Sequence, residues 1–166
     1  MAKKSLDAIE LLEADHRAVE ALFHEFRQLS QHQASGSRRR ALAEQICLEL
    51  TIHMRLEEEI FYPPVREAVR DDDLLDEAEV EHAGAKELIA QILSMKPEAE
   101  LYDAKVTVLG EYIDHHVKEE REEMFPKARK CGLDLARLGE QLSMRKRELQ
   151  AVPEALRENA LASVMA

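Results

Sequence analysis

The sequence is poor in residues that interrupt helices. Its 166 residues include only five glycines and five prolines, and there is no tryptophan. Alanine, leucine, glutamate, arginine and lysine dominate instead, and all five favour helices. The length suits one domain around one sizeable core. The composition therefore predicts an all-α fold.

Cysteines and long apolar runs are also scarce. Cys47 and Cys131 lie far apart and lack metal-type spacing, so we expect two free thiols, with a disulfide between them as the alternative. No apolar run approaches the roughly 20 residues that span a bilayer. The start Met-Ala-Lys-Lys-Ser lacks the apolar core of a signal peptide. These features predict a cytoplasmic protein without membrane association.

Basic residues are fewer than acidic ones: the chain has 23 Lys and Arg and 34 Asp and Glu, which gives a formal net charge of −11. A protein that binds nucleic acid needs a positive surface to displace counterions. The run Arg38–Arg40 falls where a helix is expected to begin and reads as a solvated first turn. We therefore expect no nucleic-acid partner.

Apolar residues recur every three or four positions through four long segments, which is typical of helices that bury one stripe. The segments run from about residue 5 to 31, from an N-cap at Ser37 to about residue 69 with a kink at Pro63–Pro64, from 71 to 96, and from 98 to 132. Four such helices predict an up-down-up-down antiparallel four-helix bundle over residues 1–132. Residues 133–166 form a weaker C-terminal helical extension that packs across one end of the bundle or makes an oligomer contact.

Polar residues interrupt every apolar stripe. The first and third stripes each contain a histidine, and the second and fourth each contain a histidine followed one turn later by a glutamate. These residues are His16, His53, Glu57, His82, His116 and Glu120. A lone histidine in a stripe is usually an ordinary core residue, but buried carboxylates without a Lys or Arg beside them are costly. A pair of divalent ions would resolve the conflict, because neutral imidazoles and ionised carboxylates are metal ligands.

The spacing fits a dinuclear site. Residues i and i+4 lie one above the other on a helix, so a histidine can ligate one ion while the glutamate bridges two. Ions in dinuclear sites lie about 3.5–4 Å apart, which one carboxylate can span. Mixed imidazole and carboxylate ligands suit iron or manganese, with zinc as a further alternative.

The chain contains two copies of one unit. In the segments 53–63 and 116–126 a histidine is followed by a glutamate four residues later and by a proline ten residues later. This repeat predicts a site with pseudo-twofold symmetry, one half for each ion. His115 and Glu119 share the i, i+4 spacing but not the distance to proline, so we expect them on the helix flank or behind the ligands.

Four stretches together resemble the hemerythrin-like, or HHE cation-binding, domain over about residues 5–130. They are Asp15-His16, His53–Pro63, Glu81-His82 and His115–Pro126. The resemblance implies a non-haem diiron centre with bridging carboxylates and an oxo or hydroxo bridge. It also implies a range of roles: oxygen binding, sensing of oxygen, nitric oxide, redox state or iron, peroxide decomposition, and iron handling.

The chain departs from the oxygen carriers of that family, which have two histidines four residues apart on the third helix. Here Ala78 and Lys86 stand at that spacing from His82. Their fourth helix also carries His-x4-Asp where this chain has His-x3-Glu. One coordination position is thus left for another carboxylate, water, peroxide or a small gas. Candidates for an extra ligand or proton donor are Glu20, Glu79 and Tyr112, each one turn from a stripe histidine.

These observations favour a diiron protein that binds, senses or reacts with dioxygen, peroxide or nitric oxide, with peroxide decomposition as the enzymatic form. The alternative is a non-enzymatic iron-binding or redox-sensing module that contacts a regulatory partner, or a second copy, through residues 133–166. A purely structural bundle is a third possibility. A ferritin-like site built on Glu13 and Glu79 would leave His53 and His116 unexplained.

Overall fold

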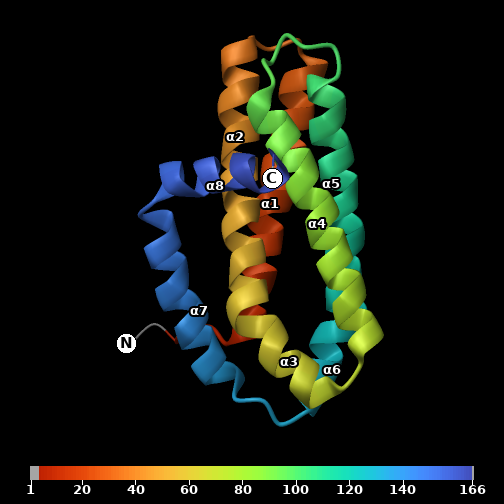
Figure 1. Cartoon of the computed structure of the whole chain (residues 1–166), viewed down its shortest axis with the longest axis vertical. Coiled ribbons are helices and arrows are strands. Elements are labelled where there is room, and N and C mark those ends of the chain that lie inside the picture. The colour runs from red at the N-terminus through yellow and green to blue at the C-terminus, as the bar shows by residue number, and fades with distance from the viewer. Residues whose placement is uncertain (1–3, 166) are drawn as a thin grey trace.

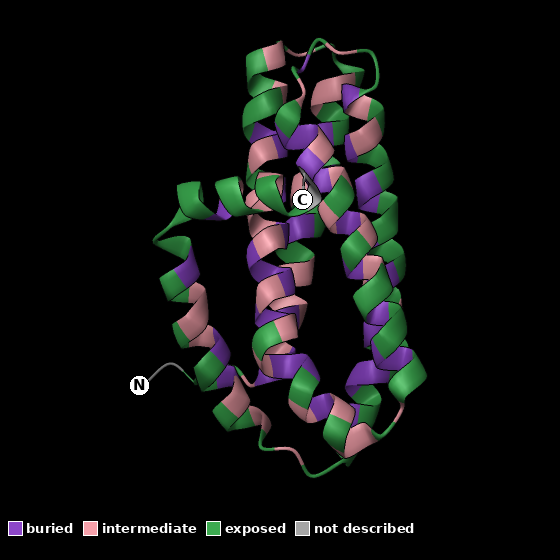
Figure 2. Ribbon diagram, viewed as in Figure 1, coloured by how far each residue is buried: buried purple, intermediate pink, exposed green. Residues whose placement is uncertain are grey.

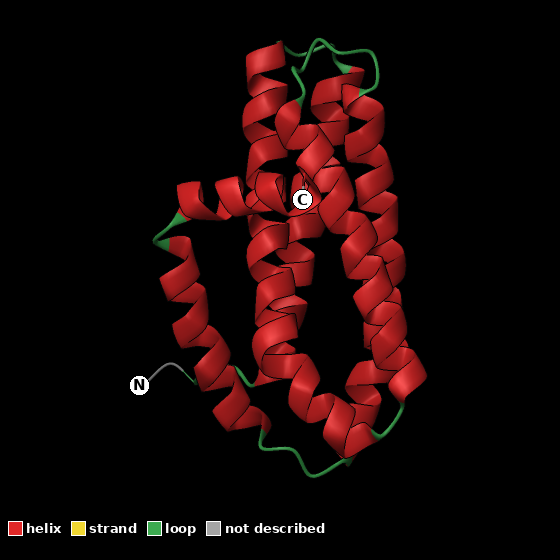
Figure 3. Ribbon diagram, in the orientation of Figure 1, coloured by secondary structure: helices red, strands yellow, loops and turns green. Residues whose placement is uncertain are grey.

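The computed structural model describes residues 4–165, with side chains up to residue 163. Within that part the chain consists of helices and loops without a strand (Figure 3). Four long helices run up, down, up and down (Figure 1), which confirms the predicted all-α bundle. They are α1 (Ala8–Gln31), α2 (Gly36–Leu56), α4 (Asp72–Ser94) and α5 (Tyr102–Glu119). No helix in the described range is long and apolar enough to cross a membrane.

Two of the predicted helices contain a π-helical turn. The turn η1 (Glu57–Phe61) joins α2 to α3 (Tyr62–Val69), and η2 (Glu120–Met124) joins α5 to α6 (Phe125–Lys130). In η1 the amide of Tyr62 donates to the carbonyl of Glu57, five residues earlier. The sequence predicted a kink at Pro63–Pro64 but not the π turn that precedes these prolines. Because the prolines fall in the first turn of α3 and of α6, where no amide donor is required, the wider turn before them accommodates their rings.

The N-termini of α1, α2 and α4 are capped by short polar side chains. Asp7 and Glu10 form a capping box at the start of α1, which begins three residues later than predicted. The predicted N-cap Ser37 is wrong, because the helix already begins at Gly36 and Ser35 accepts the hydrogen bond from the amide of Arg38. A capping side chain must precede the first turn to reach its free amides.

Two clusters of buried side chains fill the bundle, one towards each end, and buried residues line the inward helix faces (Figure 2). One cluster includes Leu12, Leu56 and Ala78, and the other includes Val19 and Leu50. Each fully buried Leu or Val contributes about 1.5–3 kcal/mol of hydrophobic stabilisation. The stripe histidines fall between the two clusters, so the polar site lies at the mid-height of an otherwise apolar core.

The C-terminal extension forms two helices beside the bundle. Helix α7 (Leu135–Gln150) packs along α1 and α2, and α8 (Pro153–Met165) runs across α2 and α4 (Figure 1). The expected packing across one end of the bundle is therefore wrong. The apolar side chains Leu142, Leu149 and Leu156 are buried in the first core cluster and hold the extension in place. The division at residue 132 and an oligomer contact both stay predictions.

Both cysteines carry free thiols in the structure. Cys47 is buried between the helices, whereas Cys131 is exposed at the end of α6. Burial raises the pKa of the Cys47 thiol to about 12, so it behaves as a small apolar core residue.

Candidate metal centre

The structure brings the six stripe residues into one cluster at the centre of the bundle. Their ligand atoms form two groups, each with all atoms within 4.8 Å of one another. One group contains His16, His53, Glu57 and Glu120, and the other contains Glu57, His82 and His116. Five of the six residues are buried, and His16 exposes 8% of its side chain. Because both groups include Glu57, its carboxylate is placed to bridge two ions.

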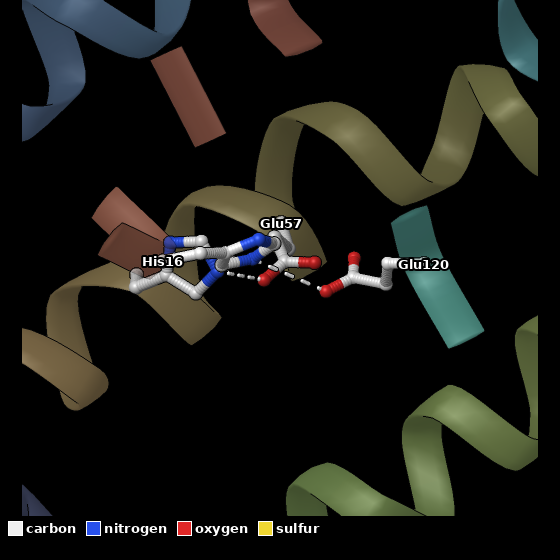
Figure 4. Close-up of side chains that lie close together, drawn as sticks. His16, Glu57 and Glu120 are labelled. Atoms are coloured by element: carbon white, nitrogen blue, oxygen red, sulfur yellow. Dashed lines mark hydrogen bonds and ion pairs between the residues drawn. The ribbon is translucent and has the colours of Figure 1, made fainter. Parts of the chain in front are cut away.

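Glu120 also reaches both halves of the cluster. Its Oε1 atom lies 3.4 Å from Nε2 of His16 and 3.1 Å from Nε2 of His116. Figure 4 shows the carboxylate of Glu57 between the imidazole of His16 and the carboxylate of Glu120. Within each half the two imidazoles face one another through Nε2, at 3.0 Å in the first pair and 3.1 Å in the second.

Three carboxylates hold the outer nitrogens of the imidazoles. Asp15 Oδ2 lies 3.2 Å from Nδ1 of His53, and Glu81 Oε1 lies 3.0 Å from Nδ1 of His116. Glu58 Oε2 lies 3.3 Å from Nδ1 of His82. An ionised carboxylate accepts hydrogen bonds, so in a neutral imidazole Nδ1 carries the proton and Nε2 presents its lone pair to the centre.

These roles were not predicted from the sequence. Glu58 is partly buried and contacts His82. Asp15 and Glu81 each stand immediately before a stripe histidine, and that shared position is the signal that could have identified them. Each contacts the histidine of the neighbouring helix rather than its own neighbour in the sequence.

In this cluster the lone pairs of imidazole nitrogens and carboxylate oxygens face one another, an arrangement that fits a bound cation. Once Nδ1 is protonated, the facing Nε2 atoms of His82 and His116 are both acceptors. Both carboxylate oxygens of Glu57 and Oε1 of Glu120 are buried and make no well-formed hydrogen bond with any described residue. Buried acceptors without donors are costly, and metal ions satisfy imidazole and carboxylate lone pairs together.

Without a metal, protons take the place of that cation. Burial alone would lower the pKa of His53, but the charges of Glu57 and Asp15 outweigh it and raise the pKa to about 10. Burial likewise opposes the charge on His116, yet Glu120 and Glu81 raise its pKa to about 11. Burial would raise the pKa of Glu120, but its imidazole neighbours, His116 first, hold that pKa well below its usual range. In the metal-free cluster His53 and His116 are therefore imidazolium ions paired with carboxylates.

Tyr62 is a site residue that the sequence analysis did not single out. Its buried hydroxyl donates to Oε2 of Glu120 at 3.1 Å and lies 3.2 Å and 3.1 Å from Nε2 of His82 and His116. Burial, followed by the charges of Glu120 and Glu57, raises the pKa of this phenol well above 10. The hydroxyl thus places an oxygen atom beside the Nε2 atoms of His82 and His116, in the second half of the cluster.

Phe125 occupies the matching place in the other half, since both aromatic residues directly precede a proline. The Phe125 ring stacks on His16, with centroids 5.9 Å apart and planes 8° apart. The Tyr62 ring lies over His82, with centroids 5.3 Å apart. The two halves therefore share their architecture and differ here by one hydroxyl group.

None of the five further candidates belongs to the two buried ligand groups, but His115 and Glu119 form a third, partly exposed group with Glu81. These candidates are Glu20, Glu79, Tyr112, His115 and Glu119. Glu20 and Glu79 are exposed, and Tyr112 exposes 40% of its surface. His115 Nε2 lies 3.2 Å from Glu119 Oε1 and 3.5 Å from Glu81 Oε2, so this pair lies behind His116 with Glu81 between.

A small cavity lies beside the four imidazoles and is otherwise lined mainly by apolar side chains such as Val19, Leu50 and Met54. The space open to the centre of a water-sized molecule is about 10 Å³. A volume of this size holds roughly one water molecule. A ligand of a few atoms fits there, whereas an organic substrate does not.

Comparison with known proteins agrees with this arrangement. A family model of the hemerythrin HHE cation binding domain matches residues 7–128, which contain all six stripe residues. A solved structure described as a hemerythrin HHE cation binding domain-containing protein, the Rv2633c homolog from Mycobacterium kansasii, superposes with a TM-score of 0.71. It is 22% identical and covers 97% of this chain and 93% of its own, so it shows a shared fold.

Two relatives differ in how much of their length is matched. The uncharacterized protein Rv2633c of Mycobacterium tuberculosis is 22% identical over 151 residues, covering 89% of this chain and 90% of its own. A protein named DNA nickase from Nostoc sp. is 29% identical over 123 residues, covering 74% of this chain. The match spans 34% of that protein's length, about a third.

Proposed function

This chain belongs to the hemerythrin HHE cation-binding domain family, and from that premise we propose that it holds two iron ions and reacts with small oxidants or gases. Dioxygen, peroxide and nitric oxide are the ligands of the right size. One observation carries the proposal: buried carboxylate oxygens without hydrogen-bond donors lie between two pairs of imidazoles whose Nε2 lone pairs converge.

The ligand groups assign residues to each ion. His16 and His53 would hold one ion, His82 and His116 the other, and Glu57 and Glu120 would bridge them. A bound iron pair supplies redox chemistry toward oxygen-containing ligands and nitric oxide. Manganese in the same positions is the alternative that the donor atoms also suit.

The residues around the ions determine what can react. The small apolar cavity admits a ligand of a few atoms and excludes larger reductants, since its open volume is about 10 Å³. The Tyr62 hydroxyl supplies a hydrogen-bond donor beside Glu120. The carboxylates of Asp15, Glu58 and Glu81 keep three imidazoles in the tautomer that ligates metal.

Metal analysis combined with absorption spectroscopy tests this proposal. We expect two iron ions per chain and a spectrum that changes when peroxide, dioxygen or nitric oxide is added. Peroxide decomposition, measured as oxygen release, would identify the enzymatic form. A protein that holds two irons but whose spectrum ignores all three ligands would refute the proposed reactivity, and a protein loaded only with zinc would refute the metal assignment.

A non-enzymatic iron- or redox-sensing module is the second candidate function. It is favoured by the extension, because α7 and α8 pack directly on the helices that carry the ligands and could pass on metal occupancy to a partner surface. The net charge of −11 argues that such a partner is not nucleic acid. Metal-dependent protection of residues 133–163 from protease, without peroxide turnover, would support this function over the first.

A further inference from the structure

We propose that Lys146, a residue of the C-terminal extension, is a positioning residue of the metal centre and acts through Asp15 on His53. This inference rests on the proposed metal centre. Lys146 Nζ lies 2.5 Å from Oδ1 of Asp15. The other oxygen of the same carboxylate, Oδ2, lies 3.2 Å from Nδ1 of His53. One carboxylate thus joins the C-terminal extension to a stripe histidine.

The environment of Asp15 explains why it needs a cation on its outer side. Its side chain is 11% exposed and that of Lys146 26% exposed, so water screens this pair less than a surface pair. A carboxylate accepts hydrogen bonds on both of its oxygens. Lys146 therefore fixes the outer oxygen of Asp15 while the other oxygen faces Nδ1 of His53.

The other half of the site repeats this construction inside the bundle. Glu58 contacts Nδ1 of His82 with one oxygen and Nζ of Lys86 with the other. The same series of imidazole, carboxylate and ammonium therefore occurs twice. In one case the ammonium comes from α4, and in the other α7 supplies it. Helix α7 of the extension thus supplies the ammonium group beside Asp15, just as α4 of the bundle supplies the one beside Glu58.

The contact also differs from the other ion pairs of α7. Neighbouring Arg145 pairs with Glu59 and Glu148 on the surface, and neither of these carboxylates contacts a stripe histidine in the described structure. Arg145 therefore helps to dock α7 without reaching the site. Substitutions at Arg145 and Lys146 can separate docking of the helix from action on His53.

The experiment is a metal titration of full-length wild type and the variants Lys146→Met, Lys146→Arg, Arg145→Met and Lys127→Met. Lys127 is a matched control, because its ammonium lies 2.6 Å from Asp71 in an exposed pair away from the site. We expect the Lys146→Met variant to bind one of the two ions about 10-fold more weakly. This is the lower end of the loss in affinity seen when residues that hydrogen-bond to metal ligands are substituted. Lys146→Arg should largely restore binding, because it keeps the charge, and both controls should match wild type.

A second readout follows the imidazole itself. In the zinc-loaded protein, the Nδ1 proton of His53 should exchange with solvent faster in Lys146→Met than in wild type, as seen by NMR. The double variant Asp15→Asn/Lys146→Met should bind metal no more weakly than Asp15→Asn alone, because Lys146 acts through Asp15.

Several outcomes would overturn the inference. Unchanged affinity and exchange in Lys146→Met would do so, as would an equal loss in Arg145→Met, which would mean that docking of α7 alone matters. An additive loss in the double variant would contradict action through Asp15. Wild type that binds no metal would refute the proposed function, and the inference with it, whereas two ions in wild type with no effect of Lys146 would refute the inference alone.

Discussion

Replacing Glu57 by glutamine should lower thermal stability and metal affinity more than any other conservative substitution in the site. Glutamine preserves the shape of the side chain but removes its charge and one of its two acceptor oxygens. Glu57 is fully buried, belongs to both ligand groups and forms the ion pair with His53. The change therefore affects both proposed ions and also the metal-free cluster.

The size of the effect follows from these contacts. In the metal-free protein the variant breaks a buried ion pair, which costs about 3–5 kcal/mol. For a chain of this length each kcal/mol lowers Tm by about 2–4 °C, so we expect a drop of roughly 6–20 °C. For the wild type, each ion present at about 100 times its Kd adds about 2.7 kcal/mol. The variant should lose at least half of that metal-dependent gain, since Glu120 alone remains to bridge the two ions.

Calorimetry with and without metal, together with a stoichiometry titration, measures both effects. Glu67→Gln is the matched control, because Glu67 lies exposed on α3 and makes no ion pair within the described chain. A Glu57→Gln variant that still binds two ions with the affinities of wild type would refute the bridging role. An unchanged Tm of the metal-free variant would refute the buried ion pair.

Three further predictions concern the phenol, the extension and pH. Tyr62→Phe removes the hydroxyl beside His82, His116 and Glu120, so titration should show about 10-fold weaker binding of one ion; equal affinities would exclude Tyr62 as a ligand. A Cβ at Gly139 would lie 2.4 Å from the backbone oxygen of Leu6, so Gly139→Ala should destabilise the fold by about 1–3 kcal/mol in urea and expose α7 to protease. In Gly36→Ala the new Cβ would meet side-chain atoms of Glu98 and Pro97 and no backbone, so this variant should be better tolerated. Equal losses in both variants would contradict that argument. The pKa values of His53 and His116 are raised to about 10 and 11 in the folded protein. Their contribution to the stability of the metal-free protein is therefore complete below about pH 6.5 and is lost as the pH rises towards those values. The loss is at most about 1.4 kcal/mol per pH unit for each group. Metal affinity should rise over the same range because ligation displaces those protons; stability independent of pH between 7 and 9 would refute the imidazolium assignment.

The sequence predicted the bundle because its signal is local. Each stripe follows from spacing within one helix, and a polar residue in a stripe is visible without knowing what faces it. His53 and Glu57 could therefore be singled out as a pair from their spacing alone. The same reasoning predicted that α1, α2, α4 and α5 alternate in direction, since the connections between them are short.

The features that were missed depend on geometry between helices. Asp15 contacts a histidine on α2, so its role depends on how α1 and α2 are rotated against each other. Tyr62 looks like an aromatic core residue, and only the fold shows that its hydroxyl faces Glu120. The π turn directly before Tyr62 begins at Glu57, so the spacing from His53 to Glu57 gives no sign of this turn. Ser37 was predicted as the N-cap in place of Ser35 because serine is a good cap at either position and only one glycine separates the two residues.

The aromatic pair Tyr62 and Phe125 makes the two ion positions non-interchangeable. A hydroxyl faces one pair of imidazoles and a plain ring covers the other, although the two halves are near-copies in sequence. Two different metals supplied together should therefore distribute unequally, and the chain should favour one mixed arrangement over its mirror. Two near-identical halves would in this way form an ordered heterobimetallic centre through the position of a single oxygen atom.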